Sequence, residues 1–222
     1  MEDIFEEIIS YENLNCAWVE FRSGKRKRPD VQMFERNLED HLFRLREDLV
    51  DGSYRHGSYH QFHVFDPKHR IIHKATVRDR LVHHAVYRVL YPKFERSFIF
   101  DSYSCRIGKG THAGVKRLET FAQRVSRNYS SPCWGLKFDI RKFFDSVDHE
   151  ILLEILARKI ESARTMLLLT NIVQSFSKPT QRWGGSLMET IRAVGLPIGN
   201  LTSQLFANVY MDAFDHFIKD EL

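Results

Sequence analysis

The stretch from residue 134 to residue 156 most constrains the fold of this chain, because its hydrophobic period changes within it. The first part alternates between apolar and other residues, the apolar ones being Trp134, Leu136, Phe138 and Ile140. This pattern predicts a strand with one buried face and with Asp139 on the other face, in a cleft or in solvent. Apolar residues then recur at helical spacing, and Asp148 is placed to cap that helix. Asp145 suits either a turn or a supporting role beside Asp139.

Length and composition fit one large domain or two small subdomains. The 222 residues are 43% apolar, which is enough for a substantial core. No apolar run approaches the length of a membrane span, and the acidic start Met1-Glu2-Asp3 is unlike a signal peptide, so we expect a soluble cytoplasmic protein. Cys16, Cys105 and Cys133 are far apart and odd in number, which favours neither disulfides nor a zinc site. We expect most of the histidines to be polar residues on the surface.

Positive charge is concentrated in the first half of the chain. Residues 50–117 contain 13 Lys or Arg against 5 Asp or Glu, whereas residues 137–222 contain 10 against 11. Such an excess is most often only a solvated face. Here it lies beside aromatic residues and a predicted strand pair, which suits a surface that binds phosphates.

The remaining pattern predicts helices around a small antiparallel sheet, an α+β class. Residues 61–74 alternate on both sides of Pro67 and predict a hairpin. Helices are expected at 2–15, at 30–50, along the apolar stripe from Leu81 to Leu90 that Pro92 ends, at 111–129 and at 163–176.

A second informative segment runs from Gly195 to Asn208. Gly195 and Gly199 suit a tight turn, and Asn200 or Thr202 can cap a helix whose apolar stripe continues to Lys219. Periodicity alone would support only an amphipathic helix behind a loop. The spacing of Pro197, Gly199 and Ser203 makes the segment more specific.

Together, Leu136–His149 and Gly195–Asn208 resemble the third and fourth conserved blocks of reverse transcriptases of the group II intron and diversity-generating retroelement kind. The resemblance implies that Asp139 and the backbone carbonyl of Ile140 bind catalytic Mg²⁺, with Mn²⁺ as an alternative. It also implies that Phe144 is a steric gate against a ribose 2′-hydroxyl. Two such ions would activate a primer 3′-oxygen and stabilise the leaving pyrophosphate.

Other blocks of the resemblance assign further residues. The hairpin at 61–74 resembles the family's fingers hairpin, in which Lys68 and Arg70 match residues that contact the triphosphate of a dNTP. Arg106 is expected near the active site, although it could equally lock loop carbonyls. Ile198 would also face the dNTP, and the residues expected to contact template or primer are Arg78, Gly199, Asn200 and Ser203.

Ile198 departs from most relatives, which carry Gln there. The run Ile198-Gly-Asn-Leu-Thr-Ser-Gln204 looks like the diversity-generating enzymes, which copy a template RNA with frequent errors at adenine. An amide near the nascent base pair can restrain it by hydrogen bonds, whereas Ile offers only shape. The preference for adenine comes from the resemblance alone.

The resemblance also predicts the organisation of the chain. We expect an N-terminal helical extension at 1–50, right-hand polymerase fingers at 51–132 and a partial palm at 133–222, without a thumb. No Tyr/Phe-x-Asp-Asp motif follows Asn208, so the chain is expected to be inactive alone as an RNA-directed DNA polymerase. Expected partners are template RNA, primer, dNTPs and a small basic accessory protein, in a bacterial or phage-encoded setting. The alternatives are a non-catalytic RNA-binding remnant and a group II intron or phage-defence lineage.

Overall fold

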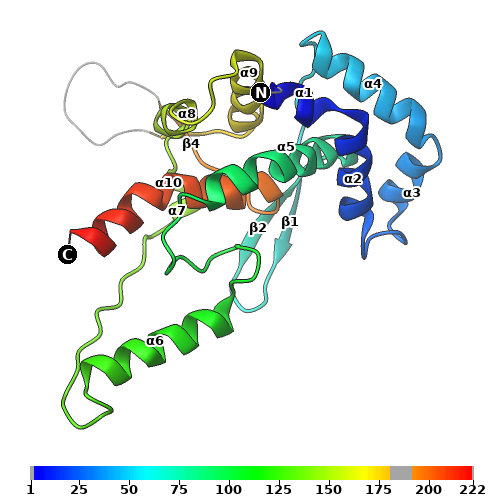
Figure 1. Ribbon diagram of the computed structural model, residues 1–222. Helices are drawn as coiled ribbons and strands as arrows, with labels where there is room; N and C mark the ends of the chain where they lie inside the picture. The colour runs from blue at the N-terminus through cyan, green and yellow to red at the C-terminus, as the bar shows by residue number, and fades with distance from the viewer. Residues whose placement is uncertain (1–2, 181–191, 222) are drawn as a thin grey trace.

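The computed structural model describes residues 3–180 and 192–221, and its helices, apart from α6 (Thr111–Val125), gather around one long central helix. That helix, α5 (Val77–Glu95), packs against α1 (Ile4–Ile9), α2 (Tyr11–Arg22) and α10 (Leu201–Asp220). Figure 1 shows α5 and α10 crossing the middle of the molecule, with the N-terminal helices at one end. Buried apolar residues of these elements form one continuous core.

The N-terminal region has shorter helices than the sequence predicted. The Ser10 hydroxyl accepts a hydrogen bond from the Asn13 amide and so caps the start of α2. Helix α2 is therefore separate from α1, and it continues to Arg22. The predicted helix at 30–50 is likewise two helices, α3 (Pro29–Glu35) and α4 (Leu38–Val50). Residue 2, where the first prediction began, lies outside the described residues.

The predicted hairpin is confirmed as β1 (His60–Val64) paired antiparallel with β2 (Arg70–Lys74), with Phe62 opposite Ile72. A second antiparallel pair joins β3 (Lys178–Thr180) to β4 (Arg192–Val194). The molecule is therefore a helix-rich mixed fold with small antiparallel sheets, which agrees with the predicted class.

Pro92 does not end α5, contrary to the prediction. The helix continues for three more residues to Glu95. A proline costs its helix one backbone hydrogen bond, and here the last turn stays helical because Tyr91 and Phe94 are buried in the core.

The predicted strand at 134–140 is not formed, so this prediction is wrong. These residues have no regular secondary structure, and Trp134 and Leu136 are 97% and 90% exposed. Strand structure needs a neighbouring strand for its backbone N–H and C=O groups. Within the described ranges none lies beside this segment, which runs back from α6 (Thr111–Val125) in Figure 1.

The C-terminal helices largely match their predictions. Asp148 caps α8 (His149–Ala157) by accepting from the amides of Glu150 and Ile151. Helix α9 (Ala163–Gln174) lies within the range predicted for it, and α10 ends one residue after Lys219.

Helix α6, which was predicted to run from 111 to 129, stops at Val125 because residues 127–129 have positive φ. Among the helices described, none is long and apolar enough to cross a membrane.

Candidate functional site

A cavity of about 660 Å³ brings together parts of the chain that are far apart in sequence. Its wall includes Arg70 at the start of β2, Phe144 in the short helix α7 (Phe143–Ser146) and Ile198 in the loop before α10. The segment from Asp101 to Cys105 and the inner face of α10 complete the wall. Three residues predicted from three separate motifs thus line one space.

A second cavity of about 730 Å³ holds Asp139 and Ile140. It adjoins the first, since both cavities are lined by Asp101, Ser104, Phe143, Met211 and Asp215. The predicted metal ligand and the predicted dNTP contacts therefore open onto neighbouring spaces. Asp139 is exposed, and no hydrogen bond or ion pair reaches its carboxylate from the residues the structure describes.

The donor atoms of this region suit a divalent cation only in part. Mg²⁺ prefers oxygen ligands, and the Asp139 carboxylate and the Ile140 carbonyl are both oxygen donors. However, no three His, Cys, Asp or Glu side chains are gathered to hold a metal ion anywhere in residues 3–180 and 192–221. These residues offer the beginning of a metal site and not a complete set of ligands.

Two other carboxylates share the cavities with different electrostatic surroundings. The pKa of Asp215 is raised, chiefly because the carboxyl is partly buried, and the charge of Asp212 adds to the effect. Burial also works to raise the pKa of Asp101, but hydrogen bonds from Arg117 and Lys219 outweigh it and lower the pKa overall. The Asp101 carboxylate thus forms ion pairs with Arg117 and Lys219.

The loop from Gly195 to Asn200 is fixed by backbone contacts on two sides. On one side the Leu196 amide donates to the Phe144 carbonyl over 2.7 Å. On the other side the His73 amide donates to the Ile198 carbonyl over 2.9 Å. The loop that carries Ile198 is therefore tied both to α7 and to the end of β2, which positions two cavity residues relative to each other.

Arg106 lines neither of these two cavities. Its guanidinium is buried, forms an ion pair of 2.6 Å with Glu95 and donates to the carbonyls of Ile99 and Ser102. This is the alternative raised for Arg106, a lock on loop carbonyls. The loop that it holds supplies Asp101 and Ser102 to the cavity.

The remaining predicted residues do not meet at the two cavities. Lys68 is exposed in the hairpin turn. Gly199 and Asn200 line a separate cavity of about 290 Å³, together with Lys74 and Arg80. Ser203 is buried in the first turn of α10, and Asn200 begins that helix without a side-chain capping bond.

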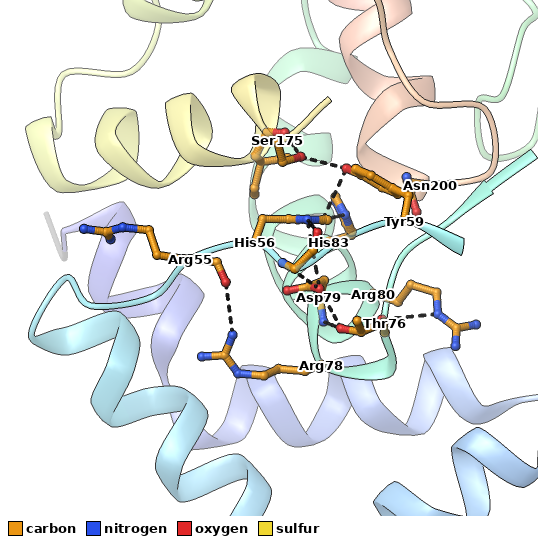
Figure 2. A network of polar contacts seen from close by, with 12 residues as sticks. Arg55, His56, Tyr59, Thr76, Arg78, Asp79, Arg80, His83, Ser175 and Asn200 are labelled. Carbon is orange, nitrogen blue, oxygen red and sulfur yellow. Dashed lines mark hydrogen bonds and ion pairs between the residues drawn. The ribbon is translucent and has the colours of Figure 1, made fainter. Parts of the chain in front are cut away.

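Arg78 is engaged with the N-terminal helices. It forms an ion pair of 2.5 Å with Asp48 of α4, and its guanidinium lies 4.7 Å from the centre of the Tyr54 ring. It also donates to the Arg55 carbonyl, a bond drawn in Figure 2. In this structure Arg78 links α4 to α5.

Although most histidines are expected at the polar surface, several have side chains that are buried and hydrogen-bonded. Figure 2 shows His56 and His83 facing each other, with 3.1 Å between their Nε2 atoms. His83 Nδ1 lies 2.7 Å from the Thr202 hydroxyl, which connects α5 to α10. Nearby, buried Asp79 accepts from Tyr54 and from Thr76. Sequence periodicity missed this network because it scores histidine only as polar.

Comparison with known proteins agrees with the motifs. The family model described as "Reverse transcriptase (RNA-dependent DNA polymerase)" matches residues 65–222. Protein YkfC of Escherichia coli (strain K12) is 25% identical over 192 residues, which cover 85% of this chain and 48% of that protein. Group II intron-encoded protein LtrA of Lactococcus lactis subsp. cremoris is 24% identical over 183 residues, which cover 81% of this chain and 28% of that protein.

A solved structure has the same fold over nearly the whole chain. A chain of the "Partial Cas6-RT-Cas1--Cas2 complex" matches with a TM-score of 0.62 and 19% identity, covering 99% of this chain and 35% of that chain. The present chain thus spans less than half the length of these similar proteins.

Proposed function

Because this chain belongs to the family of reverse transcriptases (RNA-dependent DNA polymerases), we propose that it supplies the nucleotide-binding part of an RNA-directed DNA polymerase. The polymerase would transfer a nucleotide from a dNTP to a primer 3′-hydroxyl on an RNA template. Residues 51–132 would act as fingers and residues 133–222 as part of the palm, behind the helical extension at 1–50.

The observation that carries the proposal is the shared wall of the 660 Å³ cavity. Arg70, Phe144 and Ile198 come from three motifs, and the cavity that they line adjoins the one that holds Asp139. In the proposed enzyme Arg70 neutralises charge on the triphosphate. The Phe144 ring lies under the incoming sugar and excludes a 2′-hydroxyl by its shape.

Asp139 would hold a divalent cation together with the Ile140 carbonyl. Mg²⁺ bound there would supply Lewis-acid stabilisation of the phosphoryl group being transferred. The chain's own contribution is to present an exposed carboxylate beside the nucleotide cavity and to fix the loops around it. Template RNA, primer and a basic accessory protein are the proposed partners.

The test is substitution of Asp139 in the full-length protein. We expect Asp139→Ala to reduce primer extension on an RNA template by at least about 1,000-fold and to leave RNA binding unchanged. Asp40→Ala, an exposed acid on α4, is the matched control and should extend the primer normally. Extension by Asp139→Ala near the wild-type rate would remove Asp139 from the mechanism. Wild-type protein that binds RNA without extending the primer would instead favour a non-catalytic remnant.

The finer proposal is that the polymerase is of the diversity-generating type and copies adenine with frequent errors. Its support is the place of Ile198, whose apolar side chain lines the cavity at the position where the resemblance leads us to expect an amide. The named relatives include group II intron proteins, so an intron lineage is the competing proposal. An error spectrum measured on a defined RNA template separates the two.

A further inference from the structure

Two buried histidines hold the two ends of the segment that carries Ile198. At its far end, His83 contacts the hydroxyl of Thr202. At its near end, His149 Nε2 lies 2.7 Å from the Gly195 carbonyl oxygen. Because a carbonyl can only accept, His149 carries its proton on Nε2 and donates it. His149 is 2% exposed and begins α8.

The bond from His149 completes a set of three between the loop and residues 144–149. The Gly195 amide donates to the Val147 carbonyl over 2.8 Å, and the Leu196 amide donates to the Phe144 carbonyl over 2.7 Å. His149 adds a side-chain bond to Gly195, whose amide and carbonyl are then both engaged. The peptide groups of Gly195 and Leu196 are thereby held against residues 144–149, which include Phe144, the predicted steric gate.

Gly195 leaves little freedom for this contact to shift. Its φ is +107°, and a Cβ atom there would lie 3.3 Å from the Phe176 ring. At Gly195 the loop backbone is therefore packed closely against Phe176 and is also held by hydrogen bonds with His149 and Val147. The part of the loop that follows carries Ile198, which lies in the same cavity wall as Phe144.

We propose that His149 is a positioning residue for nucleotide selection. Its Nε2–H fixes the Gly195 carbonyl and so sets the spacing between Phe144, which would face the sugar, and Ile198, which would face the nascent base pair. Loss of this bond leaves the Gly195 carbonyl without a donor and loosens the loop, which then depends on the two backbone bonds alone. This inference rests on the proposed function for the role of the cavity.

The experiment compares two amide variants of similar polarity. In His149→Gln the side-chain amide reaches the position of Nε2 and can donate to Gly195, whereas in His149→Asn it is too short. Hydrogen exchange of the Gly195 and Leu196 amides, measured on the 222-residue chain, should be at least about fivefold faster in the Asn variant and close to wild type in the Gln variant. His112→Asn, at an exposed histidine, is the control.

The second readout is the ratio of kcat/KM for dNTP to that for rNTP in the full-length protein. We expect this ratio to fall about tenfold in His149→Asn and to be restored by His149→Gln. Equal exchange or equal discrimination in the two variants would overturn the positioning role. A wild-type protein without polymerase activity would refute the proposed function while the exchange data still test the contact itself.

Discussion

At Gly199 the backbone has a φ of +120°, and a Cβ atom added there would lie 2.9 Å from Cγ2 of Ile72. Such a φ strains any residue with a side chain, and the neighbour is a branched residue of β2. The side-chain amide of the next residue, Asn200, donates to the His73 carbonyl, and the Ile198 carbonyl accepts from the His73 backbone amide. The hairpin and the cavity loop therefore meet at a glycine where any side chain would be strained.

We expect Gly199→Ala to lower the free energy of unfolding by about 1–3 kcal/mol, measured by urea denaturation. Gly110→Ala is the control, because its backbone is extended and no atom lies within 4 Å of a Cβ built there. A loss at Gly199 no larger than that at Gly110 would contradict the close approach to Ile72.

We expect Ile198→Gln to lower misincorporation opposite template adenine by about tenfold in the full-length polymerase, because an amide restores a polar restraint in the cavity. The measurement is sequencing of cDNA copied from a defined RNA. Ile71→Gln, an exposed residue of β2, is the control and should leave the error spectrum unchanged. If both variants copy adenine with wild-type errors, Ile198 does not set fidelity.

Among the elements, the loop between α5 and α6 is organised by one buried guanidinium. Arg106 bonds to both carboxylate oxygens of Glu95 and to two carbonyls of the loop. The Arg106 side chain is 4% exposed, so these carbonyls have little access to water. The loop depends on a donor with a planar fork, which lysine lacks.

Arg106→Lys should lower the free energy of unfolding by about 1–3 kcal/mol, because at least one of the buried carbonyls of Ile99 and Ser102 loses its donor. The loop should also be cleaved faster in limited proteolysis at residues 99–110. Arg26→Lys, at an exposed turn, is the matched control. Unchanged stability and unchanged cleavage would show that the loop does not need the planar guanidinium of Arg106.

For the whole molecule, the buried histidines link stability to pH. The pKa of His83 is lowered to about 3 and that of His84 to about 4, chiefly by burial and further by nearby positive charges. Both are neutral in the folded protein at pH 5, whereas in the unfolded chain they titrate near pH 6.5. The unfolded state therefore binds more protons below pH 6.5, and stability falls with the pH.

We expect the free energy of unfolding to drop between pH 7 and pH 5, with each of these histidines contributing up to about 2 kcal/mol. His84→Leu should remove about half of their joint contribution and so flatten the curve. His112→Leu, at an exposed histidine, should leave the slope unchanged. A His84→Leu curve parallel to the wild type would show that His84 is not neutral in the fold.

Local sequence determined the elements that depend on local contacts. The β1–β2 hairpin, the Asp148 cap and the helix after Asn200 formed as predicted, because turn residues, capping oxygens and apolar stripes act within a few residues. The motifs also identified Arg70, Phe144, Ile198 and Asp139 as residues that belong near one another. Two adjoining cavities bring these four residues together.

Only the tertiary structure decided the features that depend on distant partners. The alternation at 134–140 is a strand pattern, yet these residues remain unpaired because no strand among the described residues lies beside them. Arg106 holds the loop carbonyls because folding brings it within 2.6 Å of Glu95, which lies in a different element. His149 and His83 became buried donors or acceptors because α8, α5 and α10 converge on the loop before α10. A sequence pattern reports what a residue prefers, and the packing of distant segments supplies its partner.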